Sequence, residues 1–153
     1  MGIEKILSEI GTQKIEDLSI QSGDLAYGTQ ARVNYPCGDT LTRLQAVYVT
    51  TDGYVARARA DASGTMPAIG VVLDTETTTG NLVRVAVGGL QDGFNFSGYI
   101  GRTAFVSPAT AGLVTPVPGA TSGQILQKVG VAVNTSTLLI QVGAMLQVSG
   151  ASY

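Results

Sequence analysis

Beyond Gly11 the chain alternates short apolar runs with clusters of turn-forming residues. The runs are rich in valine, isoleucine, threonine and tyrosine, and glycine, proline and serine separate them, which is the pattern of an all-β domain. Asp52-Gly53 lies between two runs and predicts a tight hairpin, because glycine adopts the positive φ that such turns need. The clearest predicted strands cover residues 46–50, 54–60, 68–73, 82–87, 103–107, 128–133 and 138–142. We therefore expect an all-β fold, either a compact β-sandwich or a β-barrel.

The first ten residues follow a helical period instead. Ile3, Ile6, Leu7 and Ile10 fall at i, i+3, i+4 and i+7, and Gly11 follows as a stop signal. This spacing predicts a short N-terminal amphipathic helix or arm. So short a helix is marginal on its own in water, so its apolar stripe is expected to dock on its own domain or on a neighbour.

The β-rich part contains an internal repeat. Four blocks recur in the same order: residues 48–55 match 105–114, 62–64 match 121–123, 69–75 match 129–135, and 85–88 match 140–143. The offset between matching blocks changes by only a few residues, as differences in loop length between the copies would cause. Chance similarity between glycine-rich strands is the alternative, and so long a register disfavours it. The fold is thus expected to be built from two similar β-units, near residues 44–90 and 101–145, within one β-domain over 21–153 that follows the helix or arm at 1–20.

Charge is distributed unevenly. All eleven acidic residues lie between Glu4 and Asp92, whereas from Phe94 onward the only charged side chains are Arg102 and Lys128. Soluble monomers usually keep charges on exposed strands, so a neutral C-terminal third suggests a surface that another subunit covers. A hydroxyl-rich surface without a partner is the alternative.

Hydropathy does not predict a membrane span. The chain is 44% apolar, but amides and hydroxyls interrupt its longest uncharged stretch, residues 129–153. No apolar run approaches the roughly 18 residues that a spanning helix needs. Acidic residues among the first ten also disfavour a secretory signal, so synthesis in a cytoplasm is expected.

The residue inventory argues against an enzyme. The chain has no histidine, which removes histidine-dependent nucleophilic and acid–base catalysis and most catalytic zinc sites. Cys37 is the single cysteine, in the turn-like Tyr35-Pro36-Cys37-Gly38-Asp39, and is expected to be an inert thiol. Phosphate-binding glycine motifs are also missing, so no cofactor is expected.

The carboxylates offer only weak candidates. Glu16 with Asp17, and Asp74 with Glu76, are the close pairs that glycoside hydrolysis could use, but adjacent residues on a strand face opposite ways and the second pair is predicted to lie in a solvated turn. Asn81 could join Asp74 and Glu76 around calcium, but the regular ligand spacing is missing.

Two arginines form the one local basic feature. In residues 55–60, Arg57 and Arg59 share a strand face while alanines occupy the other. A solvated outer face is the simpler interpretation, and an ion-pair contact with an acidic partner protein is the sharper one. Nucleic-acid binding is not expected, because nine scattered basic residues face eleven acids.

Six segments from the two units form one further pattern: residues 47–55 (VYVTTDGYV), 60–63 (ADAS), 66–72 (MPAIGVV), 105–108 (FVSP), 111–115 (AGLVT) and 127–132 (QKVGVA). In these segments the chain resembles the capsid decoration (cement) and head fibre proteins of tailed bacteriophages. The resemblance spans roughly residues 44–143 and leaves the chain before Leu41 uncovered. It implies a β-rich module, commonly a homotrimer, that sits on the outer capsid of the virion and reinforces contacts between subunits of the major capsid protein.

The expected function is therefore that of a structural virion protein without catalytic activity, a cofactor, a metal, or a nucleic-acid or membrane partner. We hypothesise that Ile3, Ile6, Leu7 and Ile10 anchor the N-terminal arm on the shell or on a sister subunit, and that the neutral C-terminal strands build the oligomer interface.

Two other functions share this β-rich composition. A fibre module that binds a host receptor or glycan would expose aromatic residues, for which Phe94, Phe96 and Tyr99 are candidates, although core packing is their commoner use. A cell-surface glycosidase is the enzymatic alternative.

Overall fold

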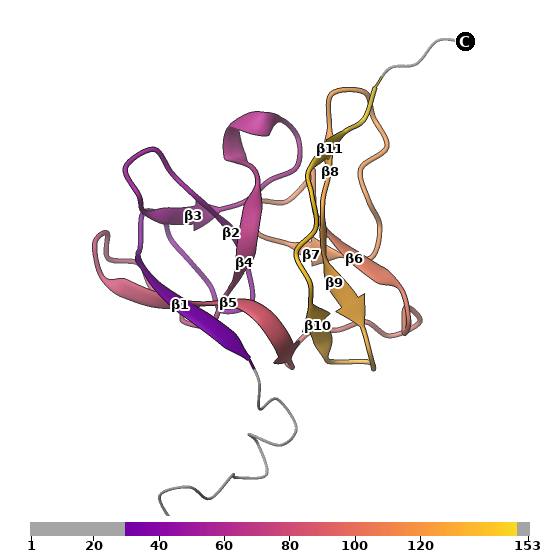
Figure 1. Cartoon of the computed structure of the whole chain (residues 1–153), viewed down its shortest axis with the longest axis horizontal. Coiled ribbons are helices and arrows are strands. Elements are labelled where there is room, and N and C mark those ends of the chain that lie inside the picture. Colours follow the sequence, from indigo (N-terminus) through magenta and orange to yellow (C-terminus); the bar gives the residue numbers. More distant parts are fainter. Residues whose placement is uncertain (1–29, 150–153) are drawn as a thin grey trace, which may run out of the picture.

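The computed structural model describes residues 30–149, and this part is nearly all β, as the sequence predicts (Figure 1). The predicted N-terminal helix lies outside the described residues. The strands are β1 (Ala31–Pro36), β2 (Ala46–Val49), β3 (Val55–Arg57), β4 (Ala68–Val72), β5 (Leu82–Gln91), β6 (Thr103–Val106), β7 (Val114–Thr115), β8 (Ile125–Leu126), β9 (Lys128–Ala132), β10 (Leu138–Ile140) and β11 (Leu146–Gln147). A single 3₁₀ turn, η1 (Ser63–Thr65), interrupts the described strands.

Most strands belong to one curled antiparallel sheet, shaped like half a barrel. Its order is β3-β2-β4-β5-β10-β9-β6-β7, and β1 also pairs with β5. The long β5 joins the halves, because residues 82–88 pair within the first half and residues 89–91 pair with β10 of the second. Figure 1 shows the two halves side by side, with the β8–β11 ribbon at the upper end of the second.

Strand pairing repeats between the halves. In the first half β2 lies between β3 and β4, and in the second β6 lies between β7 and β9. The registers correspond pair by pair: Ala46–Val71, Val47–Gly70 and Tyr48–Ala68 match Thr103–Val131, Ala104–Gly130 and Phe105–Lys128. Both ladders are irregular at the same step, between their second and third pairs. The blocks that match in sequence are therefore also equivalent in strand register.

The last matching block needs a correction of two residues. The sequence aligns Val85 with Ile140, but Val85 pairs with Val72, while Ala132, the equivalent of Val72, pairs with Leu138. Val85 therefore corresponds to Leu138. A two-residue slip preserves the alternation of faces along a strand, so the apolar pattern could not reveal it.

One glycine is required at the same place in each half. An added Cβ on Gly70 would fall on the carbonyl oxygen of Ala86, and one on Gly130 would fall on the carbonyl oxygen of Leu139. These close backbone approaches occur where the equivalent strands β4 and β9 meet β5 and β10.

The main core lies between the halves. Its fully buried members come from both, including Ala46, Val71 and Ala86 from the first and Val129 and Leu138 from the second. A second cluster lies within the first half: Cys37, Leu41, Val47, Val55, Val72, Val83 and Val85. Adjacent residues such as Val71 and Val72 therefore face different cores, as the two-residue period of a strand requires.

Gln127 joins the halves through its side chain. It is 2% exposed. Its amide accepts the N–H of Ala68 at 2.8 Å and donates to the carbonyl of Ala68 at 2.9 Å and to that of Gly143 at 3.0 Å. The side chain thereby acts as a short strand partner for the first residue of β4. Buried polar groups must be satisfied in this way.

Strand ends differ modestly from the predictions. β3 stops at Arg57, although Ala58 and Ala60 continue the buried alternation. The N–H of Ala58 still donates to the carbonyl of Ala46 in β2, whereas that of Ala60 donates to the carbonyl of Ser107, just after β6. β5 runs four residues beyond the predicted end at Val87, as far as Gln91. The sequence did not predict β1, β7, β8 and β11, which are largely exposed or only two residues long.

Candidate functional site

Arg57 and Arg59 lie on the solvent side of their segment, opposite buried alanines, as predicted. The Arg57 guanidinium pairs with Asp39 at 2.8 Å, and that of Arg59 lies 3.3 Å from Asp61 and donates to the Pro108 carbonyl at 3.1 Å. Partial burial alone would raise the pKa of Asp39, but the hydrogen bonds and charge of Arg57 hold it below its ordinary value. Both arginines therefore have acidic partners within the chain, and their contact with another protein stays a prediction.

The candidate carboxylates make structural contacts. Asp74 accepts the backbone N–H of Arg84 at 2.8 Å and pairs with its guanidinium at 2.8 Å, and this partner lowers the pKa of Asp74. Glu76 accepts the N–H groups of Thr78 and Thr77 and the amide of Asn81, so its pKa is lowered as well.

Neither group is arranged as a catalytic or metal site. A glycosidase acid needs a raised pKa rather than a lowered one. Among the described residues, no three His, Cys, Asp or Glu side chains gather in a way that could hold a metal ion. The other predicted pair, Glu16 and Asp17, lies outside the described residues.

Cys37 is fully buried in the core of the first half. Its thiol donates to the Asp39 carbonyl at 2.7 Å, and its backbone N–H donates to Asn81 at 2.8 Å. This setting is typical of a structural thiol, because a reactive one needs exposure and a nearby positive charge.

Equivalent positions of the two halves differ in charge. Asp74 corresponds to Asn134, and Arg84 to Thr137, as the matching hydrogen bonds show: Leu73 and Val133 donate their N–H groups to the carbonyls of Arg84 and Thr137. Asn134 accepts the backbone N–H of Thr137 at 2.8 Å, just as Asp74 accepts that of Arg84. The geometry is thus conserved between the copies while the ion pair is replaced by neutral groups.

The turns before β2 and β6 show the same replacement. Leu44 and Gly101 are equivalent, since their N–H groups donate to the carbonyls of Val72 and Ala132 at 2.7 Å. The preceding residue is Arg43 in the first turn, 3.8 Å from Asp92, but Ile100 in the second, where it is 57% exposed.

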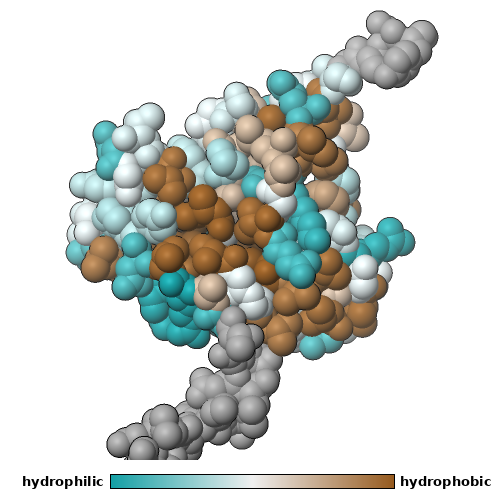
Figure 2. Space-filling view, viewed as in Figure 1, coloured by the Kyte–Doolittle hydropathy of each residue, from teal (hydrophilic) through white to brown (hydrophobic). Residues whose placement is uncertain are grey.

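Exposed apolar residues gather on the neutral half. Tyr99, Ile100, Leu113, Val117, Val133, Met145 and Leu146 are exposed there, against Val33, Val49 and Leu82 in the first half. Val133 is 43% exposed, whereas its equivalent Leu73 is 7% exposed. On the face in view, Figure 2 shows apolar residues between the halves and over the lower part of the second. This surface, where Arg102 and Lys128 are the only charged side chains among the described residues from Phe94 onward, is the first candidate site.

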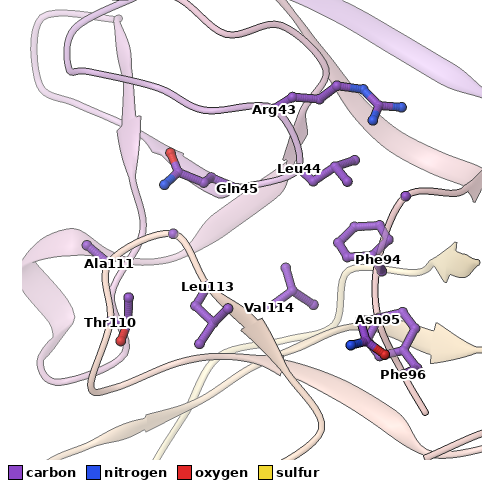
Figure 3. A pocket seen from close by; sticks show the side chains of 12 residues that line it. Arg43, Leu44, Gln45, Phe94, Asn95, Phe96, Thr110, Ala111, Leu113 and Val114 are labelled. Atoms are coloured by element: carbon purple, nitrogen blue, oxygen red, sulfur yellow. The ribbon is translucent and has the colours of Figure 1, made fainter. Parts of the chain in front are cut away.

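A pocket at the junction of the halves is the second candidate. It has a volume of about 340 Å³ and is lined by three segments, residues 43–45, 93–96 and 110–114. Leu44, Phe94, Leu113 and Val114 supply its apolar wall, and Arg43, Gln45, Asn95 and Thr110 supply its polar groups (Figure 3). Pockets of this size are at the lower end of the range for small-ligand sites.

Leu44 has an unusual backbone conformation in the pocket wall. Its φ is +75°, close to the +80° of its equivalent Gly101. A left-handed conformation costs a leucine on the order of 1–2 kcal/mol, whereas glycine adopts it freely. The first half therefore tolerates backbone strain that the second avoids, and the Leu44 side chain packs against the main core and Gly93.

The three aromatic candidates have different environments. Phe96 is buried in the main core and stacks on the partly buried Phe94 with ring centroids 5.3 Å apart. Tyr99 is 41% exposed in the turn beside Ile100. Only Tyr99 thus presents a largely open ring, and the two phenylalanines mainly pack the junction.

Comparison with known proteins adds no family assignment. A scan against protein-family models finds no match to the chain, and a search of curated proteins finds none either. Within residues 30–149, no helix has the length and apolar character that a membrane-spanning segment needs.

Proposed function

We propose that this protein is a non-enzymatic structural component of a phage particle, which binds the outer capsid surface as an oligomer and stabilises contacts between major capsid subunits. The observation that carries the proposal is the replacement of paired charges in the first half by neutral and exposed apolar groups in the second. Arg43, Asp74 and Arg84 have ion-pair partners, whereas their equivalents are Ile100, Asn134 and Thr137.

This replacement supports an interface rather than a difference in folding. Both halves keep the same strand register and the same turn hydrogen bonds, so the fold itself does not require the change in charge. Burying a charge is costly, and the centres of protein interfaces are depleted of charged residues. The neutral half is therefore the better candidate for a surface covered by sister subunits, with a homotrimer as the expected form.

The charged half is then left for solvent and for the capsid. Its exposed arginines and carboxylates neutralise one another locally, so contact with a charged shell would exchange existing pairs rather than bury unpaired groups. A cement protein acts by linkage: separating two capsid subunits must also break its contacts to both, so its binding stabilises the assembled shell. Such a role needs shape and stoichiometry and no catalytic site.

Co-sedimentation with purified heads that lack decoration tests the proposal. The full chain should pellet with heads at a saturable, whole-number ratio to capsid subunits, and bound heads should withstand higher temperature before they release DNA. Light scattering should give a trimer mass for the free protein. A chain that stays in the supernatant at every concentration contradicts the capsid role.

A version without residues 1–10 separates the arm from the β-domain. If Ile3, Ile6, Leu7 and Ile10 anchor the arm on the shell, this deletion should weaken co-sedimentation while circular dichroism of the β-domain stays unchanged. Replacing Glu4 and Glu9 with glutamine, which leaves the apolar stripe intact, is the matched control.

One observation favours a fibre module as the second candidate. Tyr99 and Ile100 stand exposed in one turn, and exposed aromatic rings are common in glycan sites. Glycan-array binding that is lost on Tyr99→Ala, without binding to heads, would favour this function. Turnover of a polysaccharide would instead indicate the glycosidase, whose candidate carboxylates Asp74 and Glu76 are already held by structural hydrogen bonds.

A further inference from the structure

The pocket between the halves has the features of a receptor for the chain's own N-terminal stripe. We infer that, in the free protein, residues 1–10 dock in this pocket within the same molecule and bury part of the stripe formed by Ile3, Ile6, Leu7 and Ile10. The inference concerns the protein away from the capsid, so it stands or falls separately from the proposed function.

The place where the chain enters the described part supports this occupant. The amide of Gln30, directly before β1, donates to the Leu90 carbonyl at 3.2 Å and to the side-chain oxygen of Gln91 at 2.6 Å. Gly93, two residues further on, lines the pocket. Figure 1 shows β1 beginning at the junction of the halves, close to the end of β5. The described chain thus begins beside Leu90 and Gln91, two residues before the pocket-lining Gly93.

The length of the connection allows docking. Residues 11–29 lie between the stripe and Gln30, and a chain of that length spans at most about 65 Å. A tether of this kind keeps the stripe at a local concentration on the order of millimolar, well above that of stripes from other molecules in a dilute sample. Docking within one molecule is therefore favoured over exchange between molecules.

The pocket wall suits aliphatic side chains. Leu44 and Val114 lie on the Phe94 side of the pocket, and the Leu113 side chain, which also lines it, points away from Leu44 (Figure 3). Leu113 is 47% exposed, so the wall has an apolar side chain that the described residues leave uncovered. An amphipathic helix binds such a site through residues at i, i+3, i+4 and i+7, which is the spacing of the stripe.

Two features preserve the opening of the pocket. Gly93 and Gly112 have φ values of +99° and +80°, and an added Cβ would lie 2.8 Å from Leu44 and 2.9 Å from Gln45. Leu44 itself keeps a left-handed conformation that Gly101 takes in the other copy without strain. The first copy thus has Leu44 where the second has Gly101, and the leucine side chain completes the wall of the pocket. Arg43 at the rim, 3.8 Å from Asp92, supplies a positive charge there, and Glu4 and Glu9 flank the stripe in the sequence.

A spin label on the arm of the full chain tests the inference. Ser8→Cys, on the polar side of the stripe, is labelled in a background where the buried Cys37 is replaced by alanine. The methyl signals of Leu44 and Leu113 should lose more than half of their intensity relative to the same sample with the label reduced. The methyl signals of Leu82, at the far end of β5, should keep theirs.

Variants and a mixed sample decide between the outcomes. Ile6→Asn in the arm and Leu113→Asn in the pocket should each restore the methyl intensities of Leu44, whereas the surface control Leu82→Asn should not. In a mixture of isotope-labelled unmodified chain and spin-labelled chain without isotopes, the signals should stay intact. Broadening in the mixture would show docking on another copy, and undiminished signals in the single-species sample would show an empty pocket; either result overturns the inference.

Discussion

Replacing Gln127 with leucine tests how the two halves are held together. The substitution keeps the size of a fully buried side chain but removes its amide, which bonds to the N–H and the carbonyl of Ala68 and to the carbonyl of Gly143. These hydrogen bonds connect the residue between β8 and β9 of the second half to β4 of the first and to the segment after β10. Leucine cannot replace any of them.

The expected loss follows from the groups left behind. A buried donor or acceptor without a partner costs about 1–3 kcal/mol. The two groups on Ala68 therefore predict a loss of about 4 kcal/mol in the free energy of unfolding, from a total on the order of 5–15 kcal/mol for a domain. For a chain of this size that corresponds to a fall in Tm of roughly 8–16 °C.

Urea and thermal unfolding followed by circular dichroism, at one fixed protein concentration, measure this loss. Gln141→Leu is the matched control, since its exposed amide only accepts from Lys128 at 3.2 Å, and it should change the free energy by less than about 0.5 kcal/mol. Gln127→Glu should be more damaging at pH 8 than at pH 5, because only a protonated carboxyl can donate. A free energy of Gln127→Leu within 0.5 kcal/mol of the parent would refute the proposed role of the amide.

Three further predictions test the repeat and the candidate interface. Because the pKa of Asp74 is lowered, its ion pair with Arg84 stabilises the fold above about pH 4 and stops doing so as the pH falls through the folded-state pKa. The exposed pair contributes at most about 1 kcal/mol to the free energy of unfolding. Asp74→Asn should remove that share of the pH dependence in urea titrations. Gly130→Ala should cost several kcal/mol, on the order of 3, because its Cβ would meet the Leu139 carbonyl, whereas Gly64→Ala, with open space around it, should cost almost nothing in the same unfolding assay. Ile100→Lys should shift the mass measured by light scattering toward the monomer without lowering Tm of the monomer, and the control Leu82→Lys should leave the mass unchanged. Equal masses for the parent and both variants would contradict the interface on the neutral half.

The strand framework could be predicted because its signals are local. Apolar runs and turn residues such as Asp52-Gly53 located the ladders β2–β3, β4 and β9, and the matching blocks located the duplication. β1 was not predicted, although Ala31, Val33 and Tyr35 alternate with Arg32 and Asn34, and the first four residues of this short strand are exposed. It is held by its pairing with β5, a contact between residues about fifty positions apart.

The candidate site was predictable only in part. The nearly neutral character of the C-terminal third is a property of composition, because the acidic residues end at Asp92 and only Arg102 and Lys128 are charged beyond it. The pocket could not be predicted, because residues 43–45, 93–96 and 110–114 form it only when the halves pack together. The strained φ of Leu44 is hidden for the same reason, since leucine normally gives no turn signal.

The sequence by itself determined the all-β class, the duplication and the asymmetry of charge, because each depends on residue types and short periods along the chain. Only the tertiary structure decided which residues are equivalent at the end of the repeat, which carboxylates have partners, and where the halves meet. A two-residue slip of register leaves the apolar alternation unchanged, and an ion pair such as Arg57–Asp39 joins positions whose separation carries no local signal. The physical reason is that the register and the ion pairs both depend on backbone pairing between distant segments. That pairing is fixed only when β5 and β10 pair and join the two copies in one sheet.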